Sequence, residues 1–173
     1  MDVKDYIRTI PDFPVKGIMF RDVTTIIGDG EGFKLAIDKM LEALRGVEFD
    51  AVAGIESRGF IFGAPIAYML GKPLVPIRKK GKLPHKTVEE SYALEYGTAT
   101  IEMHEDALKK GDRVVIIDDL IATGGSAKAA VKLCEKLGAE VVKLLFLIEL
   151  PDLGGRKTLD GYNVESITQF EGE

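Results

Sequence analysis

The sequence predicts a single α/β domain with a central, mainly parallel twisted sheet and helices on both faces. Short apolar β-type runs alternate along the chain with amphipathic helical patterns, and this alternation is typical of parallel strands joined by helical crossovers. The chain has 173 residues, of which 46% are hydrophobic. That length supports one domain with a full core and is too short for two ordinary domains, so residues 1–173 are expected to form one unit.

The expected elements follow one another in strand and helix order. Runs rich in β-branched and apolar residues predict strands at 51–55, 74–77, 113–117 and 141–148, and a closing strand at 164–170. Helical spacing of apolar residues predicts helices at 33–44, 59–70 and 124–137, with Gly71 and Gly138 as stop signals beyond the last two. Because ligands of such sheets bind outside the carboxyl ends of the strands, motifs at those ends are the candidate functional sites.

Two stretches do not fit the alternating pattern. Residues 9–25 are rich in Pro and Gly, and residues 78–104 form a connection too long for a simple joint. Connections of that length in compact domains are usually functional or mobile. The glycines of 28–32 are reminiscent of a phosphate loop, but Asp29 and Glu31 repel anions, so we interpret this segment as the entry to a helix.

Composition excludes several classes of partner. Lys and Arg total 23 against 28 for Asp and Glu, a formal net charge of −5, so nucleic acid is not expected to bind. Neither a membrane span nor a secretion signal is visible, which predicts a cytoplasmic protein with no membrane partner. The single cysteine, Cys134, cannot form an internal disulfide and is expected to be a buried structural thiol.

The most informative motif is residues 114–126. An apolar strand runs into Asp118 and Asp119, then into a glycine-bearing turn that opens a helix. Backbone N–H groups at such a helix start can hold a phosphate. A merely well-capped joint explains the turn but not the acids, since neighbouring side chains of a buried strand cannot both reach solvent. The turn lacks a Walker lysine, and no G-x-G-x-x-G follows a strand, which disfavours ATP hydrolysis and NAD chemistry.

Residues 114–126 resemble the phosphoribosyl pyrophosphate (PRPP) motif of the type I phosphoribosyltransferases, in the form found in their adenine-specific members. Three other segments resemble that group: 13–22 its adenine-recognising segment, 54–60 its pyrophosphate loop, and 78–84 with 91–97 its mobile catalytic loop. The departures are mild, with Ser126 where Thr is common and Ile121 where Leu is frequent. The resemblance implies the family fold, with a small N-terminal hood and base-recognition segment at 1–32 and a mobile catalytic loop at 78–104.

The reaction implied by the resemblance is transfer of the 5-phosphoribosyl group of PRPP to adenine, which forms AMP and pyrophosphate in purine salvage. The implied catalytic residues are Glu95, Asp118 and Asp119. The implied 5′-phosphate site is made by Ala122, Thr123, Gly124, Gly125 and Ser126. The implied pyrophosphate ligands are Ser57, Arg58, Arg78, Lys79 and Lys82. The implied adenine contacts are Met19, Phe20, Arg21 and Leu120.

The same resemblance implies Mg²⁺ as cofactor and a homodimer. The metal would arrive with the pyrophosphate and keep several waters, near Asp118 but without direct protein ligands. From the residues alone, the basic run at 78–82 is equally typical of a solvated surface, and Glu95 would alternate outward on a strand. Glu89 and Glu90 are weaker candidates for the catalytic acid.

Three other functions were weighed. A PRPP-sensing regulatory protein would keep 118–126 but should add a nucleic-acid-binding surface, which the charge balance does not support. A phosphoribosyltransferase for xanthine or orotate is disfavoured by 20–22 and 94–96. A non-catalytic interaction protein would have no use for two acids beside a phosphate turn.

Overall fold

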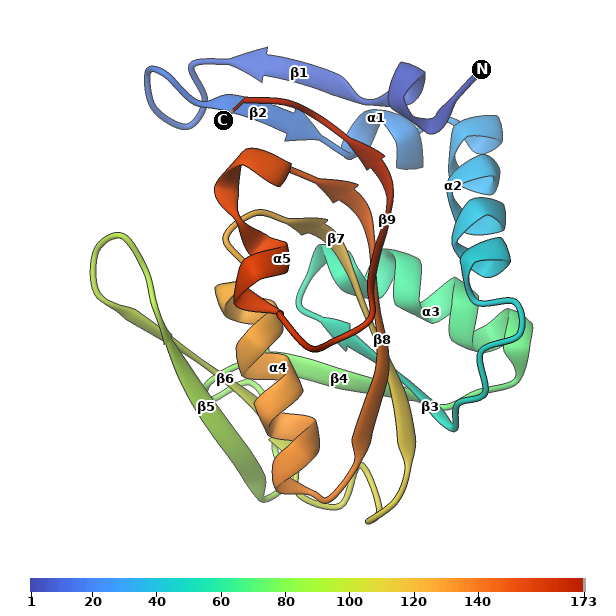
Figure 1. The fold of residues 1–173 in the computed structure, drawn as a ribbon, viewed down its shortest axis with the longest axis vertical. Helices are drawn as coiled ribbons and strands as arrows, with labels where there is room; N and C mark the ends of the chain where they lie inside the picture. Colours follow the sequence, from blue (N-terminus) through green and yellow to red (C-terminus); the bar gives the residue numbers. More distant parts are fainter. Residues whose placement is uncertain (173) are drawn as a thin grey trace.

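The computed structural model describes residues 1–172, and Figure 1 shows their arrangement. The large sheet has seven strands in the order β5-β6-β4-β3-β7-β8-β9. The run from β4 to β9 is parallel, whereas β6 pairs antiparallel with both β4 and β5. The strands are β3 (Ala51–Ile55), β4 (Leu74–Lys79), β5 (Thr87–Ala93), β6 (Thr98–His104), β7 (Arg113–Ile121), β8 (Glu140–Glu149) and β9 (Val164–Gln169). The predicted fold class is confirmed.

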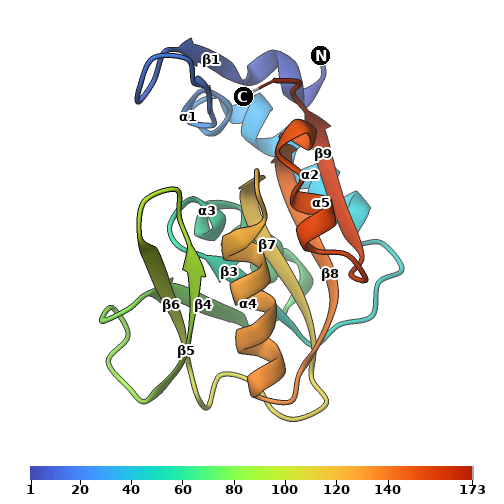
Figure 2. The ribbon, with the colours of Figure 1, turned by 60° about the vertical axis from the view of Figure 1, so that its left-hand side comes forward.

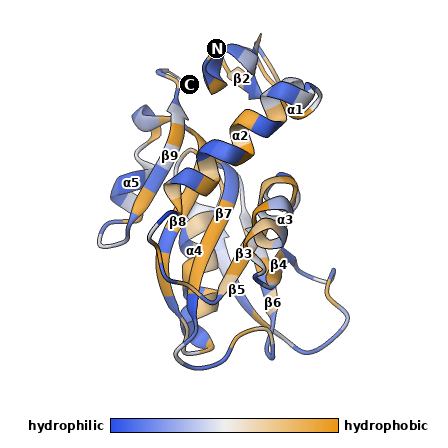
Figure 3. Cartoon of the chain, turned by 90° about the vertical axis from the view of Figure 1, so that its right-hand side faces the viewer, coloured by the Kyte–Doolittle hydropathy of each residue, from blue (hydrophilic) through white to orange (hydrophobic). Residues whose placement is uncertain are grey.

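Helices cover both faces of this sheet. Alternate residues of β7 face opposite sides: Val114 and Ile116 pack with α4 (Gly125–Lys136), while Val115 and Ile117 pack with α2 (Gly30–Ala43) and α3 (Arg58–Leu70). The chain therefore has one apolar core on each side of the sheet, as buried parallel strands require. In Figure 3 the hydrophobic colour lies on the central strands and the hydrophilic colour on the outer face of α2. Cys134 is buried in α4, as predicted, and burial raises the pKa of its thiol to about 12.

The N-terminal segment forms a small layer above the sheet. It contains η1 (Val3–Tyr6), the antiparallel pair β1 (Arg8–Pro11) and β2 (Met19–Asp22), and α1 (Thr24–Ile27). We call residues 1–27 the hood. Figure 2 shows β7 and β8 ending below the hood, so the carboxyl ends of the parallel strands face it. Val3, Ile7, Val23 and Ile26 are buried and belong to the same apolar core as α2 and α3.

Several predicted boundaries were wrong in instructive ways. Strand β7 continues past the predicted end at 117 as far as Ile121, because Asp118, Leu120 and Ile121 still pair with β8. Helix α2 begins at Gly30 instead of residue 33, because the Asp29 carboxylate caps it by accepting the Gly32 N–H at 2.9 Å. Residues 78–104 are not a continuous loop: most of them form the end of β4 and the hairpin β5-β6, which curls beside α4.

The last part of the chain returns to the same edge of the sheet. After β8 come η2 (Pro151–Leu153) and α5 (Gly155–Thr158), followed by β9. Leu150 N–H donates to the Ile121 carbonyl at 3.0 Å, so the end of β8 is attached to the end of β7. This connection places α5 directly against the turn that opens α4. Within residues 1–172, no helix has the length and apolar character needed to cross a membrane.

Candidate active site

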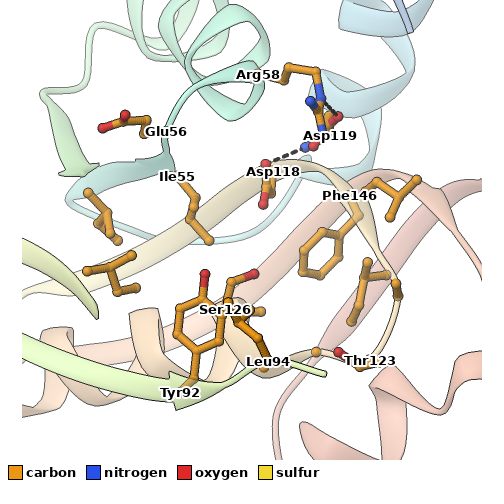
Figure 4. A pocket seen from close by; sticks show the side chains of 18 of the residues that line it. Ile55, Glu56, Arg58, Tyr92, Leu94, Asp118, Asp119, Thr123, Ser126 and Phe146 are labelled. Atoms are coloured by element: carbon orange, nitrogen blue, oxygen red, sulfur yellow. Dashed lines mark hydrogen bonds and ion pairs between the residues drawn. The ribbon is translucent and has the colours of Figure 1, made fainter. Parts of the chain in front are cut away.

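A cavity of about 710 Å³ opens at the carboxyl ends of β3 and β7. Figure 4 shows Arg58, Asp118 and Asp119 on one wall and Tyr92, Leu94, Thr123 and Ser126 on the opposite wall. Four segments far apart in the sequence converge here, as ligand sites at sheet edges generally require. The residues proposed from the sequence that line the cavity are Ser57, Arg58, Lys79, Glu95, Asp118, Asp119, Leu120 and the run 122–126.

The turn between β7 and α4 has the geometry of an anion site. Gly124 has a φ of +86°, a left-handed conformation that favours glycine, and α4 begins at the next residue. No side chain in residues 1–172 caps α4, so its first N–H groups are directed toward the cavity without a covering side chain. The hydroxyl-bearing Thr123 and Ser126 flank these groups and line the same cavity. Together they offer amide and hydroxyl donors to a phosphate at the positive end of a twelve-residue helix.

Helix α5 supports this turn from outside. The Thr158 hydroxyl donates a hydrogen bond of 2.7 Å to the Thr123 carbonyl. Gly155 approaches so closely that a Cβ there would lie 2.6 Å from Ile121 Cγ1 and 2.7 Å from the Ala122 carbonyl oxygen. The backbone of the turn is therefore held by direct contact with α5, and sequence reasoning missed both supporting residues because nothing local marks them.

The two acids at the end of β7 have different environments. Asp118 is 9% and Asp119 5% exposed. Burial raises the pKa of Asp118 well above its usual range, and the neighbouring charge of Asp119 adds to this effect. Asp119 instead accepts a hydrogen bond of 2.5 Å from Arg58 Nε, drawn in Figure 4. One carboxyl is therefore biased toward its protonated form, while the other is paired with a cation.

Arg58 is the first residue of α3 and faces the acids. Its pKa is raised, chiefly by the hydrogen bond to Asp119 and then by the charge of that carboxylate. Gly59 allows this approach, since a Cβ there would lie only 2.9 Å from Asp118 Oδ1 and 3.0 Å from the Ile117 carbonyl oxygen. Ser57 precedes α3, and the Glu56–Ser57 peptide is cis. The loop after β3 thus brings a guanidinium and backbone groups to the cavity.

Glu56 organises the basic residues that follow β4. Its Oε1 accepts hydrogen bonds from Arg78 Nε at 2.9 Å and from the Lys79 N–H at 3.1 Å. Lys79 lines the cavity, whereas Arg78 and Lys82 lie outside its lining, and Lys82 is exposed. Of the basic run predicted at 78–82, the structure therefore brings one lysine to the cavity directly.

The tip of the β5-β6 hairpin forms the outer wall. Glu95 is exposed in the turn between β5 and β6, not on a strand, and it lines the cavity with Leu94. Tyr92 projects inward from β5 and reaches the start of α4, so that a Cβ on Gly125 would lie 3.4 Å from its Cδ2. Burial raises the pKa of Tyr92. The sequence analysis assigned Tyr92 no role, although Val88, Glu90 and Tyr92 face inward at the two-residue spacing of a strand.

A smaller cavity of about 330 Å³ lies under the hood and shares Arg58 with the main one. Its lining includes Phe20 and Arg21, which were predicted, and Phe13, which packs edge-on against Phe20 with ring centroids 5.1 Å apart. Met19 lies outside both linings and is 39% exposed. Phe13 was only part of a motif in the sequence, and its pairing with Phe20 across the β1-β2 ribbon is a tertiary contact.

The fold and this site define the chain as a phosphoribosyltransferase. A family model described as a phosphoribosyl transferase domain matches residues 23–172. The adenine phosphoribosyltransferase of Agathobacter rectalis is 63% identical over 171 residues, which cover 99% of this chain and 98% of that protein. The chain belongs to the adenine phosphoribosyltransferase family.

Solved structures agree with this assignment. The adenine phosphoribosyltransferase of Thermoanaerobacter pseudethanolicus superposes with a TM-score of 0.95 at 52% identity, covering 97% of this chain and 98% of that one. The enzyme of Saccharomyces cerevisiae, in complex with D-2,5-dideoxy-2,5-imino-altritol 1,6-bisphosphate and adenine, has a TM-score of 0.90 at 40% identity, covering 95% of this chain and 96% of that one. The resemblance stated from the sequence is confirmed, and these relatives favour adenine over xanthine or orotate.

Proposed function

We propose that this chain transfers the 5-phosphoribosyl group of PRPP to adenine, forming AMP and pyrophosphate, in the cavity between α3, α4 and the β5-β6 hairpin. The observation that carries the proposal is the convergence of residues 118–126, Arg58 and Glu95 on one cavity. The yeast relative bound to adenine supports the choice of base. The partners are the four small molecules of this reaction, PRPP, adenine, AMP and pyrophosphate.

In this proposal the 5′-phosphate lies at the start of α4. The N–H groups of residues 122–126 and the hydroxyls of Thr123 and Ser126 donate to its oxygens. Asp118 and Asp119 accept hydrogen bonds from the ribose hydroxyls and orient the ring. Their negative charge also favours the positive charge that develops on the sugar as the bond to pyrophosphate breaks.

The pyrophosphate site is assigned to Ser57, Arg58, Arg78, Lys79 and Lys82. Arg58 offers a planar guanidinium suited to bidentate phosphate binding, and Lys79 adds a point charge from the end of β4. Arg78 and Lys82 contribute positive charge from just outside the cavity. Each cation stabilises the leaving group more than the bound substrate, since charge accumulates on pyrophosphate as it departs.

Mg²⁺ is proposed as the cofactor, carried by the pyrophosphate. Residues 1–172 contain no cluster of three or more His, Cys, Asp or Glu side chains that could hold a metal, so the protein alone does not supply a closed site. The oxygen donors of Asp118 and Asp119 at the cavity wall fit a hard ion that keeps its waters and binds mainly through substrate. When bound, the ion would neutralise charge on the leaving group.

Adenine is proposed to bind under the hood, with its edge paired to the main chain of Met19 and Arg21 and its face against Phe20. Leu120 borders the same space from the main cavity. Glu95 is proposed to exchange a proton with the imidazole part of the base. Closure of the hairpin tip over the site would exclude water from the cationic sugar.

A homodimer and a cytoplasmic location belong to the same proposal. The side chains of Tyr68, Met69 and Leu70 at the end of α3 are exposed by 85%, 63% and 41%, and such a cluster supports association. The free thiol of Cys134 suits a reducing compartment. Equilibrium sedimentation of the active protein tests the first point, and a stable, fully active monomer would exclude the dimer.

The reaction is tested by a substrate panel. Purified protein with PRPP and Mg²⁺ is offered adenine, hypoxanthine, guanine, xanthine or orotate, and nucleotide and pyrophosphate are measured. Adenine alone should be consumed efficiently, because a site that pairs with its exocyclic amine leaves buried polar groups unmatched with hypoxanthine. Consumption of xanthine or orotate without AMP formation from adenine would overturn the base assignment. PRPP binding without turnover of any base would favour a sensor.

A further inference from the structure

The side chain of Arg21 points away from the proposed base site and toward the C-terminal segment. Its Nη1 donates to Thr9 Oγ1 at 2.7 Å, and its Nη2 donates to the Glu171 carbonyl at 3.1 Å. The guanidinium carbon lies 4.6 Å from the centroid of the Phe170 ring. The backbone of Arg21 therefore belongs to the base-recognising strand β2, while its charge is committed to the other end of the chain.

Phe170 receives a second cation from the hood. Lys4 Nζ lies 4.6 Å from the centroid of the same ring and donates to the Gln169 carbonyl at 2.9 Å. The ring is 7% exposed, so both charges meet it in a largely desolvated setting, where cation–π attraction is strongest. Two separate elements of the hood, η1 and β2, are thereby fixed to one aromatic side chain.

Phe170 is in turn attached to the edge of the sheet that carries the phosphate turn. Its N–H donates to the carbonyl of Glu149, the last residue of β8, at 3.0 Å. Glu149 pairs with Ile121 at the end of β7. A short chain of contacts thus links Arg21 on β2, through Phe170 and Glu149, to the residue just before the phosphate turn.

The buried carboxylate of Glu149 keeps this link in place. It accepts hydrogen bonds from Arg156 on α5, at 2.8 Å to Nε, and from Ser166 and Gln169 on β9. These bonds join α5 and β9 to the end of β8, so Phe170 leaves β9 from a fixed position.

We infer that Arg21 and Phe170 are positioning residues that set the distance and orientation of the base-recognising strand relative to the phosphate turn. Neither side chain is required to touch substrate. This inference depends on the proposed function, because it concerns how the adenine half and the phosphate half of one site are held together. It predicts that weakening the contact impairs binding of the base while leaving binding of the sugar phosphate intact.

The first test replaces the ring. Phe170→Leu keeps apolar volume and removes the π face, whereas Phe170→Tyr keeps the face and serves as the matched control. In Phe170→Leu the KM for adenine should rise about tenfold, the size of a lost desolvated cation–π contact, with the KM for PRPP within about twofold of wild type. Phe170→Tyr should keep the KM for adenine within about twofold of wild type.

The second test measures binding without turnover. Calorimetry with AMP, which spans both halves, is compared with ribose 5-phosphate, which reaches only the phosphate turn. Phe170→Leu should weaken AMP binding and spare ribose 5-phosphate. Arg21→Lys keeps the charge but loses the planar fork that bonds Thr9 and Glu171, and it should shift AMP binding in the same direction. Combined with Phe170→Leu it should add less than its own separate effect, since both act through one contact.

The outcomes separate clearly. An unchanged KM for adenine in both variants, or equal losses for adenine and PRPP, would overturn the positioning role, the second result indicating general destabilisation. If Phe170→Leu fails to fold, Arg21→Lys gives the same comparison. Failure of the proposed function would look different, because the wild-type protein itself would then form no AMP.

Discussion

Asp118 and Asp119 are adjacent and chemically identical, yet the structure gives them opposite electrostatic properties. Asp119 has a cationic partner in Arg58, whereas Asp118 has burial and a like charge beside it. Neighbouring residues of a strand face different sides, which explains how one position separates a paired carboxylate from an isolated one. Sequence reasoning predicted that both acids needed partners, but only tertiary packing determines which acid obtains one.

Asp118→Asn should stabilise the protein and inactivate it. Burial raises the pKa of Asp118 above that of an unfolded aspartate, about 3.9. Its contribution to stability is therefore complete below that pH and is lost as the pH rises through the folded-state pKa. Removing the charge should increase the free energy of unfolding at pH 7 by on the order of 1 kcal/mol, about 2–4 °C in Tm. The catalytic rate should fall about 100-fold.

Thermal unfolding at pH 7 and pH 3 measures this effect. The advantage of Asp118→Asn should disappear at pH 3, where the wild-type carboxyl is protonated in both states. Asp119→Asn serves as the control and should gain no such stability, since it removes the partner of Arg58. An Asp118→Asn protein that is less stable than wild type at pH 7 would contradict the assignment.

Glu95→Gln should lower turnover with little effect on PRPP binding or stability. Glu95 is exposed at the hairpin tip, so its carboxyl contributes little to folding, but it borders the cavity where the base would bind. Losing a positioned acid–base group typically reduces the rate about 10²–10⁴-fold. Steady-state kinetics should show kcat falling about 100-fold with the KM for PRPP within about twofold.

Glu89→Gln is the matched control for Glu95, because Glu89 is an exposed carboxylate on β5 outside the cavity lining. It should retain nearly full activity. Equal losses of kcat and PRPP affinity in Glu95→Gln would indicate that the carboxyl shapes the hairpin instead of taking part in the chemistry.

At the scale of elements, the short helix α5 matters more than its four residues suggest. Its first residue lies against the carbonyl of Ala122, and its last donates to the carbonyl of Thr123. These carbonyls belong to the turn whose N–H groups face the cavity. Holding the carbonyls from outside fixes the direction of the amides inside, because each peptide unit is planar.

Gly155→Ala should weaken binding of every ligand that carries the 5′-phosphate. The added methyl would lie 2.7 Å from the Ala122 carbonyl oxygen and 2.6 Å from Ile121, so the turn must shift. The KM for PRPP and the dissociation constant of ribose 5-phosphate should each rise about tenfold, while adenine binding changes little, since small misplacements of a site cost about this much or more. Gly30→Ala is the control, because a Cβ there meets nothing within 4 Å. Equal weakening of adenine would point to general damage.

How far the elements can be predicted depends on whether their signal is local. Strands β3 and β8 and helices α3 and α4 have long apolar patterns, and they lie within a few residues of the predicted positions. The hairpin β5-β6 buries only one face, so its alternation is weak, and its pairing with β4 is set by contacts remote in sequence. The end of β7 was missed because its last residues are polar, although pairing with β8 keeps them extended.

The candidate site divides in the same way. Residues 118–126 and Arg58 follow strands directly, so strand order alone predicts that they meet at one edge. Support from Gly155, Thr158 and Phe170 comes from the far end of the chain and has no local marker. The side chain of Arg21 shows the limit most clearly, since the motif predicted its position in the base site but not that its charge contacts Phe170.

On the scale of the whole molecule, the hood and the sheet share one core. Val3, Ile7, Val23 and Ile26 are buried with residues of α2, α3, β7 and β8. The hood also contacts the C-terminal segment through Lys4 and Arg21. A layer connected in this way has no separate core of its own, so it should not unfold independently of the sheet.

We therefore predict a single cooperative unfolding transition in which base and sugar-phosphate ligands stabilise equally at equal saturation. A ligand that binds only the folded state adds RT ln(1 + [L]/Kd), about 2.7 kcal/mol at 100 times Kd, wherever on the cooperative unit it binds. Adenine, at the hood, and ribose 5-phosphate, at α4, should each raise Tm by about 5–11 °C at that saturation. Differential scanning calorimetry compares the two, with guanine at the same concentration as the non-binding control. If the hood were an independent unit, adenine would shift only a small early transition and leave the main one unmoved.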